Sequence, residues 1–188
     1  MYIRTRGIVL NHLKYGETSL IVRVFTEYSG LQSFIIKGFR SSKNKGKISL
    51  FQPLSLIEID LPEHQKSELI IFKDARLLHH YSGMSNTIEK HSIFVFLSEV
   101  LNKILCFSQA EKELFTFVYN SLISLDTTNK SCNNFHLIFL NDLTDYLGIR
   151  PIEPQSLKDL HSILEYYGLH IPNFLPIKSH LVLHEVLR

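Results

Sequence analysis

The chain has 188 residues, of which 45% are hydrophobic and 20% are charged, and its formal net charge is +2. This composition is too apolar for an intrinsically disordered chain and is sufficient for one or two domains with hydrophobic cores. No apolar run approaches the roughly 20 residues that a membrane-spanning helix needs. The N-terminal stretch also lacks the continuous apolar region of a signal peptide. We therefore expect a cytoplasmic protein with no membrane partner.

The first 80 residues have the alternation of polar and apolar residues that is typical of β-strands. Turn residues such as Ser29-Gly30 and Pro62 separate the alternating runs. The five runs cover residues 6–16, 18–30, 31–38, 54–62 and 67–78. Five short strands with one long polar connection predict a small, closed or half-closed barrel.

The remainder of the chain has apolar residues at three- and four-residue steps, which predicts α-helices. The expected helices cover residues 87–105, 109–125, 135–147, 155–167 and 180–187. Ser85-Asn86, Ser108 with Glu111, Asn133 or Asn134, and Ser179 are the expected N-terminal caps, while Gly148 and Gly168 are the expected ends of the third and fourth helices. The change of period near residues 79–85 predicts a domain boundary, with a β domain at 1–80 and an α-helical domain at 81–188.

Charge is unevenly distributed between these two parts. Residues 1–50 carry nine Lys and Arg residues and two acidic ones, a balance of +7, whereas residues 51–188 carry eleven basic and sixteen acidic ones, a balance of −5. Such an asymmetry indicates that the front of the chain contacts a polyanion.

A basic stretch, KGFRSSKNKGK at residues 37–47, connects the third and fourth expected strands. A nucleotide-binding P-loop would need Gly at position 41 and Ser or Thr at position 48, where the chain has Ser41 and Ile48. No dinucleotide-binding glycine pattern or nucleophile-elbow pattern occurs either. With every catalytic motif tested failing, we do not expect an enzyme.

Metal binding is not expected from the cysteines or the histidines. Cys106 and Cys132 have no partner at the spacing of a zinc site. His180 and His184 have the spacing of a metalloprotease helix, but Leu181 stands where that motif requires Glu. We therefore expect no metal and no cofactor.

The basic stretch remains open to two interpretations, a solvated loop or a site that holds phosphates. Glycines and serines in the stretch, further basic residues on the strands and interleaved aromatic residues favour the second, because cationic barrel grooves with stacking aromatics bind single strands. The aromatic residues are Tyr15, Phe25, Tyr28, Phe34 and Phe39, of which Phe25 and Phe34 are expected in the core. The candidate phosphate-binding residues are Arg4, Arg6, Lys14, Arg23, Lys37, Arg40, Lys43, Lys45 and Lys47.

Several motifs in order resemble the RecO family of recombination mediators. They include Arg-Gly-Ile-Val-Leu at 6–10, Tyr-Gly-Glu-Thr at 15–18, Lys-Gly-x-Arg at 37–40, LFQPLSLIEIDL at 50–61 and LTDYLGIRP at 143–151. The tail HIPNFLPIKSHLVLHEVL at 170–187 is similar to the last helical segment of one bacterial branch of the family. The resemblance thus covers nearly the whole chain.

The resemblance implies a five-stranded OB-fold barrel followed by an all-α domain, the α+β class. It implies a DNA repair and recombination mediator that binds single- and double-stranded DNA and anneals complementary strands. The implied protein partners are RecR, the C-terminal tail of single-stranded-DNA-binding protein and, indirectly, RecA, and the implied location is the bacterial nucleoid. Arg23, Lys37, Arg40 and Lys43 would hold phosphates, with Lys45 and Lys47 extending that patch.

One feature departs from the family pattern. Many members insert a four-cysteine, often zinc-binding module after the third helix, whereas here Gly148 is followed by a short linker and no cysteine lies beyond Cys132. This departure keeps two alternatives open. Beside the DNA mediator, one alternative is a protein-interaction adaptor with weak DNA binding. The other is an RNA-binding OB protein, since phosphate contacts and stacking do not separate RNA from DNA.

Overall fold

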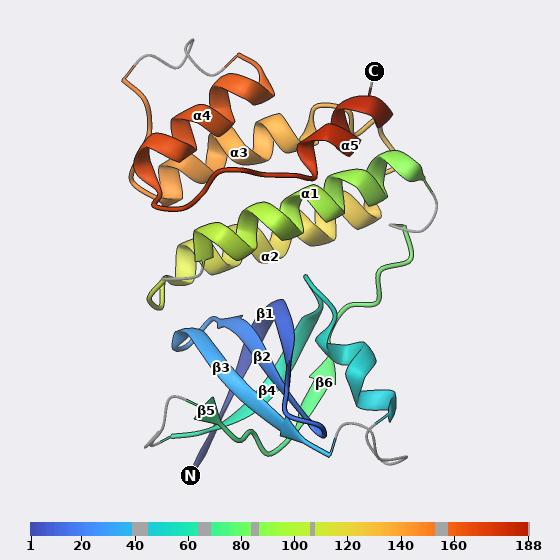
Figure 1. The fold of residues 1–188 in the computed structure, drawn as a ribbon, viewed down its shortest axis with the longest axis vertical. Helices are drawn as coiled ribbons and strands as arrows, with labels where there is room; N and C mark the ends of the chain where they lie inside the picture. The colour runs from blue at the N-terminus through green and yellow to red at the C-terminus, as the bar shows by residue number, and fades with distance from the viewer. Residues whose placement is uncertain (39–44, 64–68, 84–86, 106–107, 153–157, 188) are drawn as a thin grey trace. The chain divides into compact units, whose positions relative to one another are not determined.

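The computed structural model describes residues 1–38, 45–63, 69–83, 87–105, 108–152 and 158–187. Strands precede helices along the chain, which confirms the α+β class (Figure 1). The chain divides into two compact units, each described separately below. Unit 1 comprises Met1–His80 and Leu105–Tyr119, and unit 2 comprises Tyr81–Ile104 and Asn120–Arg188.

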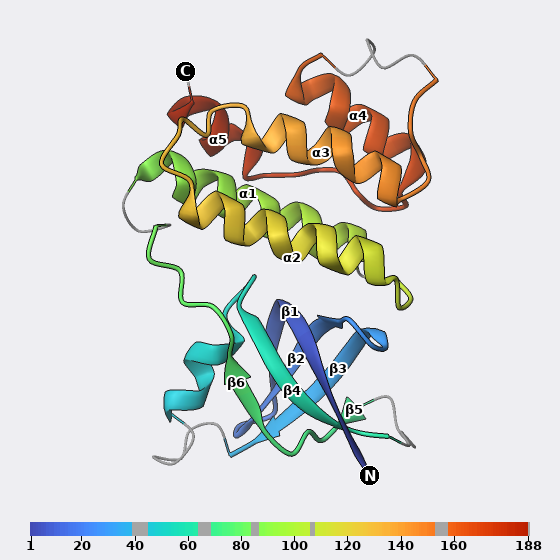
Figure 2. The same ribbon diagram turned by 180° about the vertical axis from the view of Figure 1, so that it is seen from behind.

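Unit 1 contains a six-stranded sheet in the order β5-β3-β2-β1-β4-β6. Neighbouring strands are antiparallel except β5, which is parallel to β3. The strands are β1 (Tyr2–Tyr15), β2 (Ser19–Thr26), β3 (Gly30–Lys37), β4 (Leu56–Pro62), β5 (Leu69–Ile70) and β6 (Ala75–Leu77), and a 3₁₀ helix, η1 (Lys45–Phe51), precedes β4. Figure 2 shows β4 and β6 side by side from behind.

The expected fifth strand is in fact two short strands. β5 pairs with β3 at one edge of the sheet, and β6 pairs with β4 at the other edge. Since both pieces come from one continuous segment, residues 69–77 connect the two edges. Among the described residues, β5 and β6 share no ladder, so the segment bridges the edges without closing the barrel by hydrogen bonds.

The core of unit 1 consists of the inward residues of these strands. Alternation buries Leu20, Val22 and Val24 on β2 and Phe34 and Ile36 on β3, as the period of two requires. The cluster contains Val9, Leu20, Val22, Val24, Phe34, Ile36, Phe51, Ile57, Ile59, Leu61 and Ile70. Burying each large side chain contributes on the order of 2 kcal/mol, so this cluster stabilises the sheet that carries the candidate site.

Residues 105–119 belong to unit 1 although most of them are helical. The Phe115 ring packs against Phe25 with a centroid distance of 5.8 Å, and the backbone N–H of Leu31 donates to the Ser108 carbonyl at 3.1 Å. Gly30 has a positive φ of 66°, and a Cβ there would lie 2.5 Å from the Gln109 carbonyl carbon. The β2–β3 turn therefore needs glycine for its backbone conformation and for this close approach.

Unit 2 is built from helices. They are α1 (Ile88–Ile104), the second half of α2 (Lys112–Thr127), α3 (Phe135–Tyr146), α4 (Leu160–His170) and α5 (His180–Val186). Their inward faces bury apolar residues at three- and four-residue steps, including Phe96, Leu97, Leu140, Leu143 and Tyr167. The Tyr167 hydroxyl donates to the Leu140 carbonyl at 2.7 Å, which satisfies that polar group in the core.

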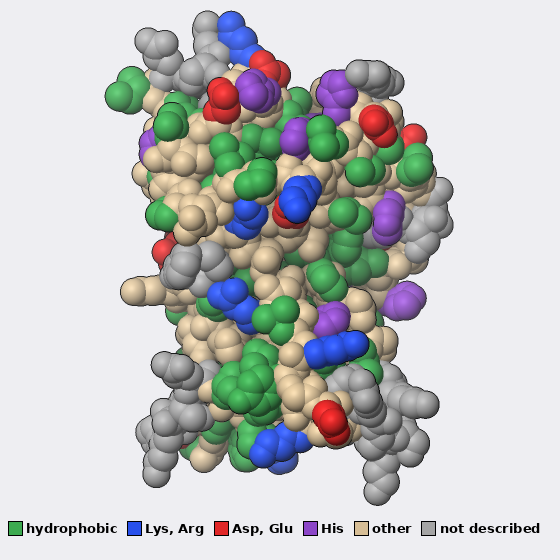
Figure 3. All heavy atoms as spheres, in the orientation of Figure 1, with side chains coloured by type: hydrophobic (Ala, Val, Ile, Leu, Met, Phe, Trp, Pro, Cys, Tyr) green, Lys and Arg blue, Asp and Glu red, His purple; other side chains and the backbone are tan. Residues whose placement is uncertain are grey.

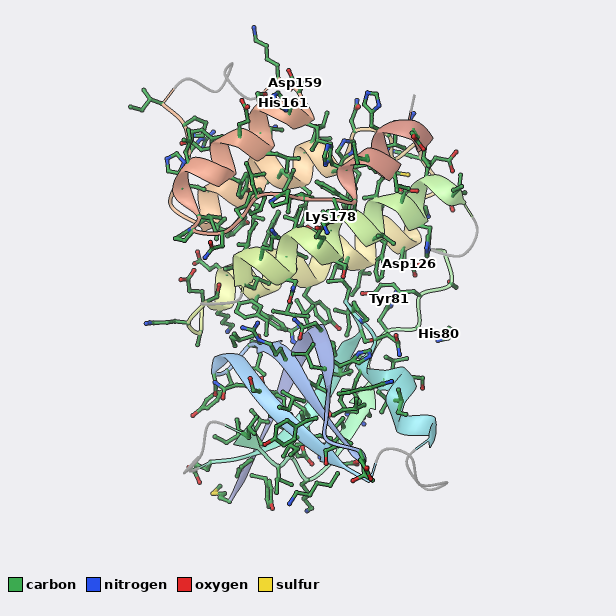
Figure 4. The ribbon with its side chains drawn as sticks, in the orientation of Figure 1. His80, Tyr81, Asp126, Asp159, His161 and Lys178 are labelled. Atoms are coloured by element: carbon green, nitrogen blue, oxygen red, sulfur yellow. The ribbon has the colours of Figure 1, made fainter. Side chains whose placement is uncertain are left out.

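Several expected helix ends were wrong. Helix α2 begins at Lys112, so Ser108 does not cap it. Helix α4 continues through Gly168 to His170, because glycine there leaves room for the Leu175 side chain, which would lie 2.8 Å from an added Cβ. Asp159 caps α4 in a capping box with Ser162 (Figure 4). The expected Ser85-Asn86 cap lies outside the described residues.

Two long side chains of α1 hold the segment that leads into α5. The Glu99 carboxylate accepts hydrogen bonds from the Lys178 and Ser179 backbone N–H groups at 2.9 and 2.8 Å, and from the Ser179 hydroxyl at 2.6 Å. The Lys103 ammonium donates to the carbonyls of Phe174 and Pro176 at 2.6 and 2.9 Å. The expected cap Ser179 thus precedes α5, but its hydroxyl bonds to Glu99 instead of capping the helix.

Candidate nucleic-acid interface

The outer surface of β1, β2 and β3 forms a regular three-by-three array of side chains, which we call the open face. The register places one residue from each strand in each of three rows. The rows are Asn11–Arg23–Ser33, Leu13–Ile21–Ile35 and Tyr15–Ser19–Lys37. With strands about 4.8 Å apart and about 3.3 Å per residue, the array measures roughly 10 by 13 Å.

None of these nine side chains is buried, in contrast to their neighbours along the strands. Leu20, Val22 and Val24 alternate with the open-face residues of β2 and point into the core. Leu13 and Tyr15 are the most exposed of the apolar and aromatic members, at 59% and 54%. The open face is therefore a solvent-facing surface with an apolar middle row.

A β-bulge in β1 decides which residues reach this face. The register with β2 shifts between Val9 and Asn11, which leaves Leu10 without a partner. An extra residue reverses the alternation that follows it, so Leu13 and Tyr15 turn outward and His12 and Lys14 turn to the opposite side. No feature of the sequence indicates this bulge, so Leu13, Ile21 and Ile35 are site residues that the sequence analysis did not predict.

The charge of this region is basic. Arg23 and Lys37 occupy opposite outer rows of the open face, and Lys14 is exposed near the end of β1. The three strands, which the structure describes in full, contain no Asp or Glu. Arg23 is partly exposed and Lys37 is exposed. This surface therefore presents cations beside apolar side chains without acidic residues on the same strands.

Two other candidate arginines on β1 have carboxylate partners. The Arg6 guanidinium forms a two-point ion pair with Glu27, with both N–O distances at 2.8 Å, and lies 4.8 Å from the centre of the Tyr119 ring. Arg4 forms a similar pair with Asp60 at 2.8 and 3.2 Å, and its Nε is 3.5 Å from Glu58.

These pairs shift the pKa values of both members. The hydrogen bond from Arg6 lowers the pKa of Glu27 and raises that of Arg6, although partial burial opposes both changes. The hydrogen bond between Arg4 and Asp60 acts in the same way on their pKa values. A phosphate would have to displace a bound carboxylate at either arginine, so we expect Arg4 and Arg6 to contribute little to phosphate binding.

The basic stretch of residues 37–47 is only partly described. Arg40 and Lys43 lie outside the described residues, and Lys45 and Lys47 lie on η1 with side chains that are not described. The far end of η1 is fixed, because Phe51 is buried and its carbonyl lies 2.9 Å from the His12 Nδ1. The stretch thus leaves the sheet at Lys37, a corner of the open face. The end of η1, which follows the stretch, contacts β1.

The aromatic candidates divide as expected between core and surface. Phe25 and Phe34 are fully buried, which confirms that they are core residues. Tyr15 lies on the open face, while Tyr28 is exposed in the β2–β3 turn. Phe39 lies outside the described residues. Figure 3 shows one side of the molecule, where basic and hydrophobic side chains occur together over the strands.

Neither a metal-binding cluster nor a membrane-spanning helix occurs in the part of the chain that the structure describes. There, no three His, Cys, Asp or Glu side chains gather closely enough to hold a metal ion. No described helix has the length and apolar character needed to cross a bilayer. Cys132 is a buried free thiol, and Cys106 lies outside the described residues.

Two family models together match most of the chain. Residues 1–81 match the family model described as recombination protein O N terminal, and residues 85–167 match recombination protein O C terminal. The chain belongs to the RecO family. Its N-terminal strands are therefore the OB-fold domain of that family, which explains the strand order and the bridging role of residues 69–77.

Curated RecO proteins from related bacteria align with most of this chain. The chain is 35% identical to the DNA repair protein RecO of Bacteroides fragilis over 181 residues, which is 96% of this chain and 73% of that protein. It is 38% identical to the DNA repair protein RecO of Flavobacterium johnsoniae over 152 residues, 80% of this chain and 64% of the relative. The chain thus spans about two thirds to three quarters of the length of these relatives.

A third relative aligns along nearly its whole length. The DNA repair protein RecO of Azobacteroides pseudotrichonymphae is 28% identical over 239 aligned positions that cover 99% of both chains. Because this chain has 188 residues, many of those positions are gaps within it. In this comparison the additional residues of the relative therefore fall within the aligned region.

Proposed function

We propose that this chain is a DNA repair and recombination mediator whose OB-fold domain binds DNA through the open face. The observation that carries the proposal is the open face itself, which combines Arg23 and Lys37 with three acid-free strands. The β2–β3 surface is the usual binding surface of OB folds for oligonucleotides. Membership of a family whose curated members are named DNA repair proteins supports the choice of DNA.

The proposed activity is non-enzymatic. The cations would neutralise phosphates of single- and double-stranded DNA. This would reduce the repulsion between the phosphates of two complementary strands and so allow them to anneal. Binding of this kind releases counterions and therefore weakens steeply with salt. Together with RecR, the protein would help to load RecA onto DNA coated by single-stranded-DNA-binding protein, whose C-terminal tail it would contact. These partners follow from the family alone, and a DNA partner would place the protein at the bacterial nucleoid.

The test is a binding and annealing assay with matched charge reversals. Fluorescence anisotropy would measure the affinity for a labelled single strand at low and high salt, and strand annealing would be followed by energy transfer between labelled complements. The variant is Arg23→Glu with Lys37→Glu. Its control is Lys130→Glu with Lys158→Glu, which makes the same charge change at residues of unit 2.

We expect the open-face variant to lose affinity and annealing, while the control retains both. Equal losses in the two variants would show that net charge alone matters and would count against a site on the open face. Binding that does not respond to salt would contradict phosphate neutralisation. Competition with RNA of the same sequence decides the nucleic acid, since stronger binding to RNA would favour the RNA-binding alternative.

A further inference from the structure

The open face carries more than the charges that a phosphate backbone needs. Its middle row, Leu13–Ile21–Ile35, is wholly apolar, and Tyr15 stands at one corner with about half of its surface exposed. Phosphates gain nothing from such side chains, because apolar surface attracts only groups that leave water favourably. These residues are therefore unexplained by charge neutralisation alone.

The arrangement of the rows indicates how a single strand would lie on this surface. The cations Arg23 and Lys37 stand in the two outer rows, on either side of the apolar row. A strand with its phosphates near the outer rows would place bases over the middle row and against Tyr15. In a duplex the bases are stacked on each other, so their flat faces are not available to this surface.

We propose that Tyr15, with the adjoining apolar row, is the element of the open face that favours unpaired bases and so selects single strands over duplex DNA. The inference rests on the proposed function and adds to it a division of roles. The cations bind any DNA, whereas the ring of Tyr15 stacks on an exposed base. Stacking on aromatic side chains tolerates every base, so this selection would not depend on sequence.

Removal of one stacking platform in single-strand complexes typically weakens binding by about 5- to 150-fold. Tyr15 stands at a corner and keeps solvent on one side, so we expect an effect near the lower end, about tenfold for Tyr15→Ala. Duplex binding should change by less than about twofold, because the cations remain. Tyr15→Phe keeps the ring and should bind like the unaltered chain.

Tyr28→Ala provides the matched control. Tyr28 is exposed to a similar degree, 59% against 54%, but lies in the β2–β3 turn and outside the open face. Both tyrosines are largely exposed, so neither replacement should prevent folding. Leu13→Ser, at a residue that is 59% exposed, is a second variant on the same face and should reduce single-strand binding to a smaller extent.

The experiment uses the full chain and three probes of equal length, namely an oligothymidylate, an abasic strand and a duplex. We expect the unaltered chain to prefer the oligothymidylate to the abasic strand by about tenfold, and Tyr15→Ala to lose this preference. Equal affinity of the unaltered chain for both strands, or equal loss on all three probes in Tyr15→Ala, would overturn the inference. If the unaltered chain bound none of the probes, the proposed function itself would be wrong.

Discussion

Removing the charge of Arg6 and removing the charge of Lys37 should have different effects on folding and on DNA binding. Arg6 is held by Glu27 and lies over the rings of Phe115 and Tyr119, at 5.5 and 4.8 Å from their centres. Lys37 is exposed at a corner of the open face. We predict that Lys37→Gln weakens DNA binding without loss of stability, whereas Arg6→Gln weakens folding without a change in the salt response.

The size of the Lys37 effect follows from counterion release. Each phosphate contact on a single strand contributes about 0.7 to the slope of log K against log salt. Loss of one contact therefore reduces that slope by about 0.7 and lowers the affinity about fivefold at 0.1 M salt. The free energy of unfolding should stay within about 0.5 kcal/mol, as for most exposed residues.

The Arg6 effect follows from its contacts in unit 1. A partly exposed two-point ion pair contributes up to about 1 kcal/mol, and a cation over an aromatic ring adds about 0.5–1 kcal/mol. Arg6→Gln should therefore lower the free energy of unfolding by about 1–2 kcal/mol and the melting temperature by several degrees, at roughly 2–8 °C per kcal/mol.

Salt-dependent anisotropy titrations and urea unfolding of the same two variants test this reasoning. The unaltered chain gives the reference slope, and Arg4→Gln extends the comparison because Arg4 is also paired with a carboxylate. A reduced salt slope for Arg6→Gln with unchanged stability would refute the roles assigned to Arg6 in folding and to Lys37 in DNA binding. So would an unchanged slope for Lys37→Gln.

Three further predictions concern the fold around the site. Gly30→Ala should destabilise the chain by about 2 kcal/mol or more in urea unfolding, whereas Gly16→Ala, with a φ of +63° but nothing within 4 Å, should cost only about 1 kcal/mol. Burial lowers the pKa of His136 to about 4, below its usual 6.5. The unfolded chain therefore binds a proton first on acidification, and stability should fall by about 2–3 kcal/mol between pH 6.5 and 4, a loss that His136→Leu should remove. Glu99→Ala should speed amide hydrogen exchange at Lys178 and Ser179, whose N–H groups donate to this carboxylate, and unchanged exchange would contradict the role assigned to it.

The layout of the chain followed from the sequence because its periodicities are strong. Alternation predicted the first four strands, and the steps of three and four predicted all five helices. The end of α4 was less predictable, because Gly168 remains within the helix where Leu175 packs closely. The sequence alone does not distinguish a glycine that allows close packing within a helix from one that ends a helix, because it does not show which residue packs against the glycine.

The candidate site was predictable in its charge and less so in its geometry. The distribution of charge along the sequence showed the basic front of the chain. The carboxylate partners of Arg4 and Arg6 come from residues 21 or more positions away, so the folded structure is needed to show these two ion pairs. The bulge at Leu10 likewise reverses the direction of Leu13 and Tyr15, which local alternation could not indicate.

The most direct test of the open face is a map of where a single strand binds. Backbone amide chemical shifts would be recorded by NMR while an oligothymidylate is titrated into the full chain at low salt. We predict that the largest changes fall on Leu13, Tyr15, Arg23, Ile35 and Lys37, with little change at Glu58 and Asp60 on β4. Changes confined to β4 or to unit 2, with none on β1–β3, would contradict the assignment of the DNA-binding surface to the open face.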